Sequence, residues 1–327
     1  MAKIPARILG LEKPLPGLEL IGRGKVRNSY KIPGHDDKML VDVTNNISIF
    51  DFVLNAQVEG KGGILTAINH FLVTQVIKDA CESDFIAAGA AIDEYLPAEL
   101  RGNSELQRRA TVVKRVNPPD VEDIVRFILT GTGWESYQKD GTVCGHTLPA
   151  GLTDGSMLPY PIYTPSTKAE IGHDVHLTAD SIAERYGTER EQLALKIARA
   201  IHKHAMKRGI LMGDTKFEFS FTNGRLCLVD ERGTPDSSRY FDFEAYLEAR
   251  KEGKLPPSLD KQFVRNYGIE IGIKKRNPKV NEDVAWVHEQ VIPNEILDKT
   301  SEIYRNIFWR LTGHSISDYQ KNQMGIA

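Results

Sequence analysis

Charged and aromatic residues alternate through the segment GDTKFEFSFTNGRLCLVDE, which covers residues 213–231. Successive side chains of a β-strand point to opposite faces, so Asp214, Lys216 and Glu218 are expected on one face and the phenylalanines at 217, 219 and 221 on the other. Grouped carboxylates and an amine can hold a metal ion or a charged substrate, or they can form the solvated side of a half-buried strand. The pattern therefore predicts either an active site or a solvent-exposed strand face, with the phenylalanines in the core.

The turn TNGR decides which side chains of the two strands share a face. A two-residue Asn-Gly turn pairs Thr222 with Arg225 and puts Asp230 on the phenylalanine face. A three-residue loop pairs Phe221 with Arg225 and gathers more apolar side chains on one face, so we favour this register. It makes Glu218 and Asp230 diagonal neighbours, roughly 7–8 Å apart. Two carboxylates this close repel each other unless a cation lies between them, and a partly hydrated Mg²⁺ that also holds phosphates suits this position.

Cations and hydroxyl groups in three other segments could bind anions. In GRGKVRNSY, the glycines allow the backbone to approach a ligand, and Lys25 and Arg27 point to one strand face, although the Gly-Lys-Ser/Thr ending of a Walker A loop is absent. In TPSTKAEIGHD, Ser166 and Lys168 could hold an oxyanion, whereas the His-Asp-x-His spacing is poor for zinc. In TPDSSRY, Arg239 could clamp a phosphate with two hydrogen bonds. An ordinary turn or helix cap is the alternative for these segments.

Composition and charge exclude several classes of function. The 327 residues include 42 Lys and Arg against 44 Asp and Glu, so the net charge of −2 predicts no general attraction to nucleic acid. The first residues contain no long apolar run before their prolines and therefore do not predict a secretory signal. No uncharged run approaches the ~18 residues that span a bilayer, so no membrane association is expected. Three widely spaced cysteines argue against a disulfide framework and favour the cytoplasm.

The elements that must position these groups fall into three predicted parts. Residues 1–117 are rich in strand-like runs, with one helix after the glycines at 62 and 63, and a Pro-Pro pair follows as a boundary. Residues 118–241 form a central part that contains the alternating segment. Residues 242–327 are helical, with helices expected at 242–252, 258–267, 280–291 and 294–312.

The beginning of the central part is less regular. The segment VEDIVRFILTG is predicted as a helix, on which Arg126 lies one turn beyond Glu122 and could simply form an ion pair with it. A region rich in Gly, Pro and Thr then extends from residue 131 to about 167. If this region has no secondary structure of its own, so long a loop usually either serves a site or is disordered. Its aromatic content argues against disorder, so we expect it to serve a site.

Taken in order, these segments resemble those of the SAICAR synthetase family, whose members are ATP-dependent amide ligases of purine biosynthesis. The similar motifs are GKVRNSY, ISIFDFVL, GKGGILTAINHF, VEDIVRFILTGTGWESYQKDGTVCGHTLPAGL, PIYTPSTKAEIGHD, GDTKFEFSF, LVDERGTPDSSRY and TSEIYRNIFWRLTG. They cover almost the whole chain, and the region after residue 131 is similar to the longer form of the family. The resemblance implies an α+β fold in which a β-rich N-terminal lobe covers an ATP-grasp-like C-terminal part with added C-terminal helices.

The resemblance also implies substrates and the residues that hold them. The substrates would be ATP, L-aspartate and carboxyaminoimidazole ribotide (CAIR), and the metal would be Mg²⁺. ATP would be bound by Lys25, Arg27, Lys114, Glu218 and Asp230, of which the last two would also hold Mg²⁺. CAIR would be bound by Arg126, Thr132, Ser166, Lys168, Asp214, Lys216 and Arg239. Asp214 and Lys216 would be catalytic, with Asp214 either holding the amine of the substrate or accepting its proton.

Several positions depart from the usual pattern of the family. Asn28 stands where Asp is common after Gly-Lys-Val-Arg, and Asn45 and Asn46 replace the usual Asp-Arg. Thr132 replaces a Ser but keeps a hydroxyl, and Ser220 replaces a Gly. The loss of Asp-Arg removes an ion pair, and the sequence does not reveal what compensates for it.

The chemistry of an amide ligase agrees with these residue types. Transfer of the γ-phosphoryl group of ATP to a carboxylate gives an acyl phosphate that an amine can attack, and the protein mainly positions groups and neutralises charge. CAIR, aspartate and ATP are all anionic, so a cleft lined by Lys and Arg is expected. Two alternatives stay open: a kinase-like phosphotransferase without an amine acceptor, and a catalytically weakened nucleotide-binding relative. The oligomeric state is undecided, with a monomer favoured.

Overall fold

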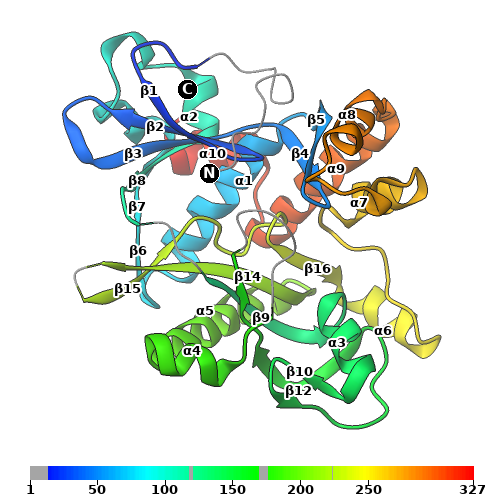
Figure 1. Cartoon of the computed structure of the whole chain (residues 1–327). Helices are drawn as coiled ribbons and strands as arrows, with labels where there is room; N and C mark the ends of the chain where they lie inside the picture. Colours follow the sequence, from blue (N-terminus) through cyan, green and yellow to red (C-terminus); the bar gives the residue numbers. More distant parts are fainter. Residues whose placement is uncertain (1–13, 118–120, 169–175, 223) are drawn as a thin grey trace.

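The computed structural model describes residues 14–117, 121–168, 176–222 and 224–327, and it contains two main β-sheets surrounded by helices (Figure 1). The first sheet is antiparallel, with the strand order β1-β2-β3-β8-β7. Its strands are β1 (Glu19–Arg23), β2 (Arg27–Ile32), β3 (His35–Val43), β7 (Phe85–Ala88) and β8 (Ala110–Lys114). Tyr30 and Leu40 alternate into its core, where they meet Leu106 of the short helix α2 (Ser104–Arg109).

The second sheet has the strand order β12-β9-β14-β15-β6, with β13 also paired to β9 and β16 also paired to β14. The strands are β6 (Glu82–Ser83), β9 (Val121–Leu129), β12 (Ser156–Tyr163), β13 (Ser166–Thr167), β14 (Ile210–Thr222), β15 (Arg225–Val229) and β16 (Ser238–Asp242). The long strand β14 pairs with β9, β15 and β16, so it connects most of this sheet.

Helices cover one face of the second sheet and leave the other face toward the N-terminal lobe (Figure 1). The covering helices are α4 (Ala179–Tyr186) and α5 (Glu189–Met206). Ile197 and Ile201 of α5 belong to the same buried cluster as Phe217 and Phe219 of β14. Burial of these phenylalanines turns the alternate residues of β14, which include Lys216 and Glu218, away from α5.

The C-terminal helices join both sheets. They are α6 (Phe243–Lys251), α7 (Gln262–Glu270), α8 (Asn281–Glu289), α9 (Asn294–Thr312) and α10 (Ile316–Met324). Helices α9 and α10 pack against α1 (Lys61–Phe71), and the hairpin of β4 (Asn46–Ile49) and β5 (Phe52–Gln57) packs against α7 and α8. The end of the chain therefore supports elements from its beginning.

This architecture confirms the predicted α+β class. The three cysteines are free, as expected. No helix among the described residues is long and apolar enough to cross a membrane. The division of the chain at residues 117 and 241 stays a prediction, and its Pro-Pro boundary lies outside the described residues.

The favoured register of the β14–β15 hairpin is wrong. Thr222 pairs with Arg225, as a two-residue turn requires, and Phe219 pairs with Leu228, which shares its core. Both faces of β15 are buried, so apolar side chains alone could not select the register. Phe221 is also not a core residue, because it lies near the end of β14 with 69% of its surface exposed.

The helix predicted around Arg126 is also wrong, because this segment forms strand β9. Nearly every side chain of β9 is buried, and a strand buried on both faces shows no period that separates it from a buried helix. The expected long loop after it contains instead α3 (Thr132–Asp140), β10 (Thr142–Val143), β11 (His146–Thr147), β12 and β13.

Candidate active site

Asp214 lies at the centre of a cluster of cations formed by three neighbouring strands. In the registers of the second sheet, Asp214 of β14 stands opposite Arg126 of β9 on one side and Arg239 of β16 on the other. Its Oδ2 accepts a 2.9 Å hydrogen bond from Arg126 Nη1 and another from Arg239 Nη1. Two guanidinium groups against one carboxylate leave a positive charge available, which is the requirement for binding an anion.

Arg126 is held in place by several groups of the protein. Its Nη2 donates to Thr132 Oγ1 at 3.0 Å, and its Nε donates to Thr164 Oγ1 at 3.0 Å. Burial lowers the pKa of Arg126, while the charge of Asp214 raises it. Gly133 allows α3 to approach, because a Cβ at this position would lie only 3.1 Å from Arg126 Cδ. The arginine is therefore preorganised, and its predicted i,i+4 ion pair is replaced by the one with Asp214.

A second group of ion pairs follows β14 toward the hairpin. Lys216 Nζ lies 2.5 Å from Glu122 Oε1, and Lys168 Nζ lies 2.6 Å from Glu218 Oε2. Burial lowers the pKa of Lys216, but the charge and hydrogen bond of Glu122 more than offset this, so its pKa is raised overall. Ser166 lies opposite Glu122 in the β13–β9 pairing, and its buried hydroxyl has no hydrogen-bond partner in the described part of the chain. A polar group left free here is available to a ligand.

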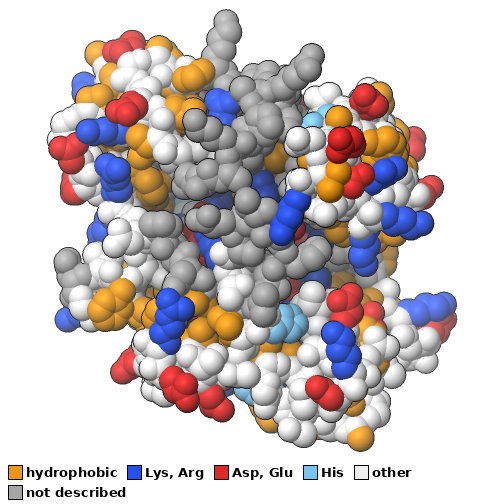
Figure 2. All heavy atoms as spheres, in the orientation of Figure 1, with side chains coloured by type: hydrophobic (Ala, Val, Ile, Leu, Met, Phe, Trp, Pro, Cys, Tyr) orange, Lys and Arg blue, Asp and Glu red, His pale blue; other side chains and the backbone are white. Residues whose placement is uncertain are grey.

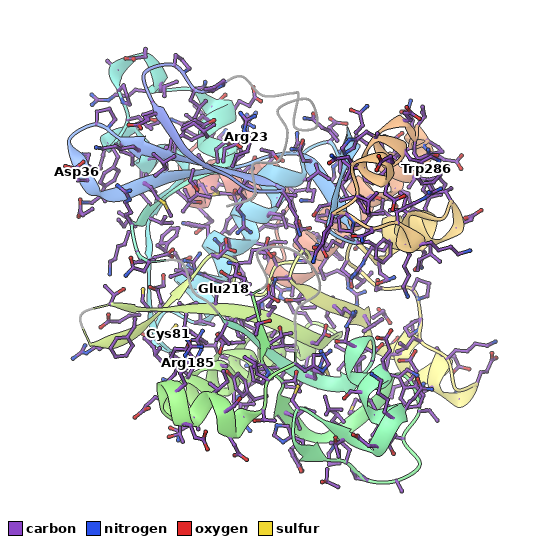
Figure 3. The ribbon with its side chains drawn as sticks, in the orientation of Figure 1. Arg23, Asp36, Cys81, Arg185, Glu218 and Trp286 are labelled. Carbon is purple, nitrogen blue, oxygen red and sulfur yellow. The ribbon has the colours of Figure 1, made fainter. Side chains whose placement is uncertain are left out.

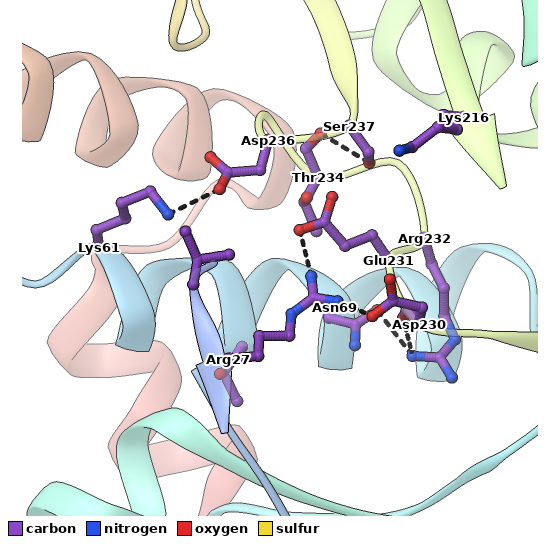
Figure 4. Close-up of polar contacts among 12 residues, drawn as sticks. Arg27, Lys61, Asn69, Lys216, Asp230, Glu231, Arg232, Thr234, Asp236 and Ser237 are labelled. Carbon is purple, nitrogen blue, oxygen red and sulfur yellow. Dashed lines mark hydrogen bonds and ion pairs between the residues drawn. The ribbon is translucent and has the colours of Figure 1, made fainter. Parts of the chain in front are cut away.

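The glycine-rich segment of the N-terminal lobe meets the end of β15. Arg27 forms ion pairs with Asp230 and Glu231 (Figure 4), and Lys25 forms one with Asp51. Asp230 has a left-handed backbone (φ 60°), so the chain turns after Val229 and the side chain no longer follows the alternation of the strand. This turn explains how Asp230 reaches Arg27 although the hairpin has the two-residue register.

Lys114 lies at the end of β8, beside β15. Burial raises the pKa of the Cys227 thiol, and the nearby charge of Lys114 partly opposes this effect. Its own side chain is exposed. Lys114 therefore lies near β15 and forms no ion pair with another residue that the structure describes.

A buried trio of side chains fixes the loop that follows Asp230. Lys61 of α1 donates to Asp236 at 2.7 Å (Figure 4). The Tyr304 hydroxyl of α9 donates to the other oxygen of the same carboxylate. Burial raises the pKa of Asp236, but Lys61, Lys261 and Tyr304 hold it well below its ordinary value. The loop between Asp230 and Arg239 is thus anchored to both ends of the chain.

Four functional candidates were missed from the sequence. Glu122 and Glu231 are the partners of cations in the site, and Glu231 had the signal of following Asp230 directly. Lys261 and Arg265 lie at the start of α7, where the pattern indicates only a helix. Neither side chain forms a hydrogen bond or ion pair with another described residue, and burial lowers the pKa of each.

The predicted arrangement of carboxylates around a metal is only partly reflected in the geometry. Glu218 and Asp230 each face a separate cation rather than each other. Within the described ranges, no group of three or more His, Cys, Asp or Glu side chains is placed to hold a metal ion. One or two carboxylates with substrate phosphates are nevertheless the usual ligands of Mg²⁺, and Glu218 and Asp230 could supply such carboxylates.

The structure accounts for the departures at Asn45 and Ser220. Asn45 Oδ1 accepts a 2.9 Å hydrogen bond from the Gly62 amide, and therefore satisfies a free N–H group in the first turn of α1. Ser220 Oγ donates to the Asn117 carbonyl oxygen at 2.9 Å. Asn28 and Asn46 are buried. The missing Asp-Arg pair is thus replaced, at least in part, by a contact with a helix terminus.

The site lies between the first and second sheets, where Arg27 of β2 meets Asp230 and Glu231 after β15. Figure 2 shows Lys and Arg side chains on the surface between these two parts of the molecule, and Figure 3 places Glu218 near its middle. The cations near β14 thus come from segments that are far apart in the sequence. Together, the fold and the site bring several separate cations close to one another, an arrangement suited to several anionic groups.

Comparison with known proteins places the chain in a class, the SAICAR synthases. The SAICAR synthase of Saccharomyces cerevisiae, solved in complex with SAICAR, matches with a TM-score of 0.77 at 30% identity, covering 93% of this chain and 98% of that chain. The phosphoribosylaminoimidazole-succinocarboxamide synthases of Thermodesulfovibrio yellowstonii and Maridesulfovibrio salexigens are 41% and 38% identical over 307 residues, which is 92% of this chain and 98% and 96% of theirs. The SAICAR synthetase family profile matches residues 20–280. The chain belongs to the SAICAR synthetase family, which confirms the resemblance.

Proposed function

We propose that the protein joins L-aspartate to the carboxylate of CAIR, with conversion of ATP to ADP and phosphate, to give SAICAR. The observation that carries this proposal is the number of separate cationic positions around β14. Arg126 and Arg239, Lys168 and Lys216, and Lys25 and Arg27 come from different elements of the fold. A ligase with three anionic substrates needs several such positions, whereas one anion would need only one.

The ribotide phosphate would bind where two arginines converge. Arg126 and Arg239 already hold a carboxylate oxygen of Asp214, and Thr132 offers a hydroxyl next to Arg126. Ser166, Lys168 and Lys216 would contact the rest of CAIR. These residues were predicted to bind CAIR, and their convergence from five segments supports that prediction.

ATP would lie between the N-terminal lobe and the end of β15. Lys25, Arg27 and Lys114 would neutralise its phosphates, displacing Asp51, Asp230 and Glu231 from the first two. Glu218 and Asp230 would hold Mg²⁺, which supplies additional positive charge on the phosphates when it is bound. The carboxylates released from Arg27 would then be free to act as ligands.

Aspartate would bind near α7. Neither Lys261, which directly precedes α7, nor Arg265, which lies in it, has an ion-pair partner among the described residues. Lys261 lies close to Asp236, and Arg265 lies close to Asp214. Their charges suit the two carboxylates of an amino-dicarboxylic acid. The acceptor amine would be delivered next to the CAIR carboxylate, and Asp214 is the predicted group to hold that amine or accept its proton.

In the proposed reaction, the carboxylate oxygen of CAIR attacks the γ-phosphorus of ATP, and ADP leaves. The amine of aspartate then attacks the resulting acyl phosphate, and phosphate leaves with the carboxylate oxygen as the amide forms. Arg27, Lys25 and Lys216 stabilise the charge on the transferred group. No side-chain nucleophile is needed.

Release of ADP in the presence of different acceptors tests this function. The ligase requires CAIR and aspartate together, whereas a kinase-like phosphotransferase would release ADP with an alcohol acceptor. Binding of ATP without release of ADP would indicate a weakened relative. A cytoplasmic location and a monomeric state stay predictions that size-exclusion chromatography and localisation can check.

A further inference from the structure

The hairpin of β4 and β5 has an unusual turn. Its two turn residues, Phe50 and Asp51, both have left-handed backbones, with φ of 49° and 66°. Turns of this kind are normally built from Asn, Asp and Gly, and a bulky aromatic residue disfavours a positive φ. Contacts outside the hairpin must therefore hold Phe50 in place.

These contacts join the hairpin tip to two different parts of the site. Asp51 forms an ion pair with Lys25, in the glycine-rich segment. The guanidinium of Arg265, in α7, lies 5.1 Å from the centre of the Phe50 ring. Helix α7 approaches closely because residue 268 is Gly, and a Cβ there would overlap Ile49 Cδ1. The tip, defined here as Phe50 and Asp51, thus bridges the proposed ATP and aspartate positions.

The charge of Asp51 acts on both sides of this bridge. Burial and the charge of Arg239 lower the pKa of Arg265, while Asp51, with Asp260 and Asp214, raises it. The side chains of Lys25 and Asp51 are 45% and 46% exposed, so a ligand can reach their ion pair. An exposed pair is weak and can be exchanged for a stronger anion at little cost.

This inference rests on the proposed function, in which Lys25 binds a phosphate of ATP. We infer that Asp51 is a positioning residue that occupies Lys25 until nucleotide phosphate replaces it, and that Phe50 transmits this exchange to Arg265 and α7. Lys25 cannot satisfy Asp51 and a phosphate fully at the same time, so nucleotide binding releases the tip. Since the tip also contacts α7, the occupancy of one site changes the other, and the effect must be reciprocal.

The test compares Asp51→Asn with a matched control, Asp36→Asn. Asn tolerates a left-handed backbone, so the variant keeps the turn and loses only the charge. Asp36 also pairs with a lysine, Lys31, at 2.9 Å, but its side chain is 85% exposed and lies at the outer end of the N-terminal sheet, far from Glu218 (Figure 3). Affinity for ADP with Mg²⁺ is measured by calorimetry on the full chain.

Asp51→Asn is expected to bind ADP about twofold to fivefold more tightly than the unaltered protein, because this is the usual strength of an exposed ion pair. Asp36→Asn is expected to leave the affinity for ADP unchanged. Hydrogen exchange gives a second readout: ADP is expected to change exchange in residues 46–57 and 262–270, and Asp51→Asn to suppress the change in 262–270. Equal or weaker ADP binding by Asp51→Asn, or no response of 262–270 in the unaltered protein, overturns the inference. Failure of the unaltered protein to bind ADP at all would instead overturn the proposed function on which it rests.

Discussion

Replacement of Asp214 by Asn removes the anion that Arg126 and Arg239 share. Arg126 is almost completely buried, and its other partners in the structure are neutral oxygens of threonine residues. Arg239 is more accessible, with 25% of its side chain exposed, and Asp214 itself is 11% exposed. The variant therefore leaves the buried guanidinium of Arg126 and the partly exposed guanidinium of Arg239 without an ion-pair partner among the described residues.

The expected loss of stability follows from this burial. Breaking a buried ion pair lowers the free energy of unfolding by about 3–5 kcal/mol. Because Arg239 and Asp214 are partly exposed, we expect a loss at the lower end of this range, about 3 kcal/mol. A change of 1 kcal/mol lowers the Tm of a large domain by about 2–4 °C, so a decrease of roughly 6–12 °C is expected. A phosphate ligand would supply the missing charge, and at 100 times its Kd it would raise the free energy of unfolding by about 2.7 kcal/mol.

Thermal unfolding with and without ribose 5-phosphate tests this reasoning, with Asp123→Asn as the control. Asp123 forms an ion pair of 2.7 Å with the buried Arg190, and this pair is separate from the cluster of cations around Asp214. Both variants are expected to lower the Tm, but only Asp214→Asn should gain more from the ligand than the unaltered protein does. A Tm of Asp214→Asn within about 2 °C of the unaltered protein, or an equal ligand effect in both variants, would refute the assignment. Near-full turnover by Asp214→Asn would refute a role as a base.

Three further outcomes follow from the contacts. Glu218 faces Lys168 rather than a second carboxylate, and its side chain is only 7% exposed, so Glu218→Gln is expected to lower the free energy of unfolding in urea by about 1.5–3 kcal/mol while abolishing Mg²⁺-dependent ADP release; clear stabilisation would instead indicate repulsion. Gly62→Ala is expected to cost about 1–3 kcal/mol in the same assay, since its Cβ would overlap the Val43 carbonyl oxygen. Burial raises the pKa of Asp260 from 3.8 to about 6, so the folded protein binds a proton there that the unfolded chain has released, and stability from this group falls as the pH rises from about 4 to 6. Asp260→Asn should flatten that fall in urea titrations at pH 4 and pH 6, and an unchanged slope would show that Asp260 does not titrate in this window.

Alternation was sufficient to predict β14 and its charged residues, because α5 buries one face of the strand. Phe217 and Phe219 lie in the core as expected. The same reasoning was wrong where apolar side chains occur on both faces of a strand. The segment around Arg126 was predicted as a helix, and the register of β15 was chosen incorrectly, because neither pattern carries a face preference.

The ion pairs of the site could not be predicted by sequence pattern. Arg27 and Asp230 are separated by about 200 residues, and Lys61 meets Asp236 over a similar distance in the chain. Such contacts depend on how the lobes pack, which local periodicity does not describe. The family resemblance identified Arg27 and Asp230 as site residues, but it did not reveal that each neutralises the other in the absence of ligand.

The fate of the CAIR carboxylate oxygens tests the central claim most directly. CAIR labelled with ¹⁸O in its carboxylate would be converted with ATP and aspartate, and the released phosphate and SAICAR would be analysed by mass spectrometry. The proposed acyl phosphate predicts that one labelled oxygen moves to phosphate in each turnover and the other stays in the new amide. Phosphate without label, or ADP released without aspartate-dependent transfer of the label, would contradict activation of the carboxylate by phosphoryl transfer.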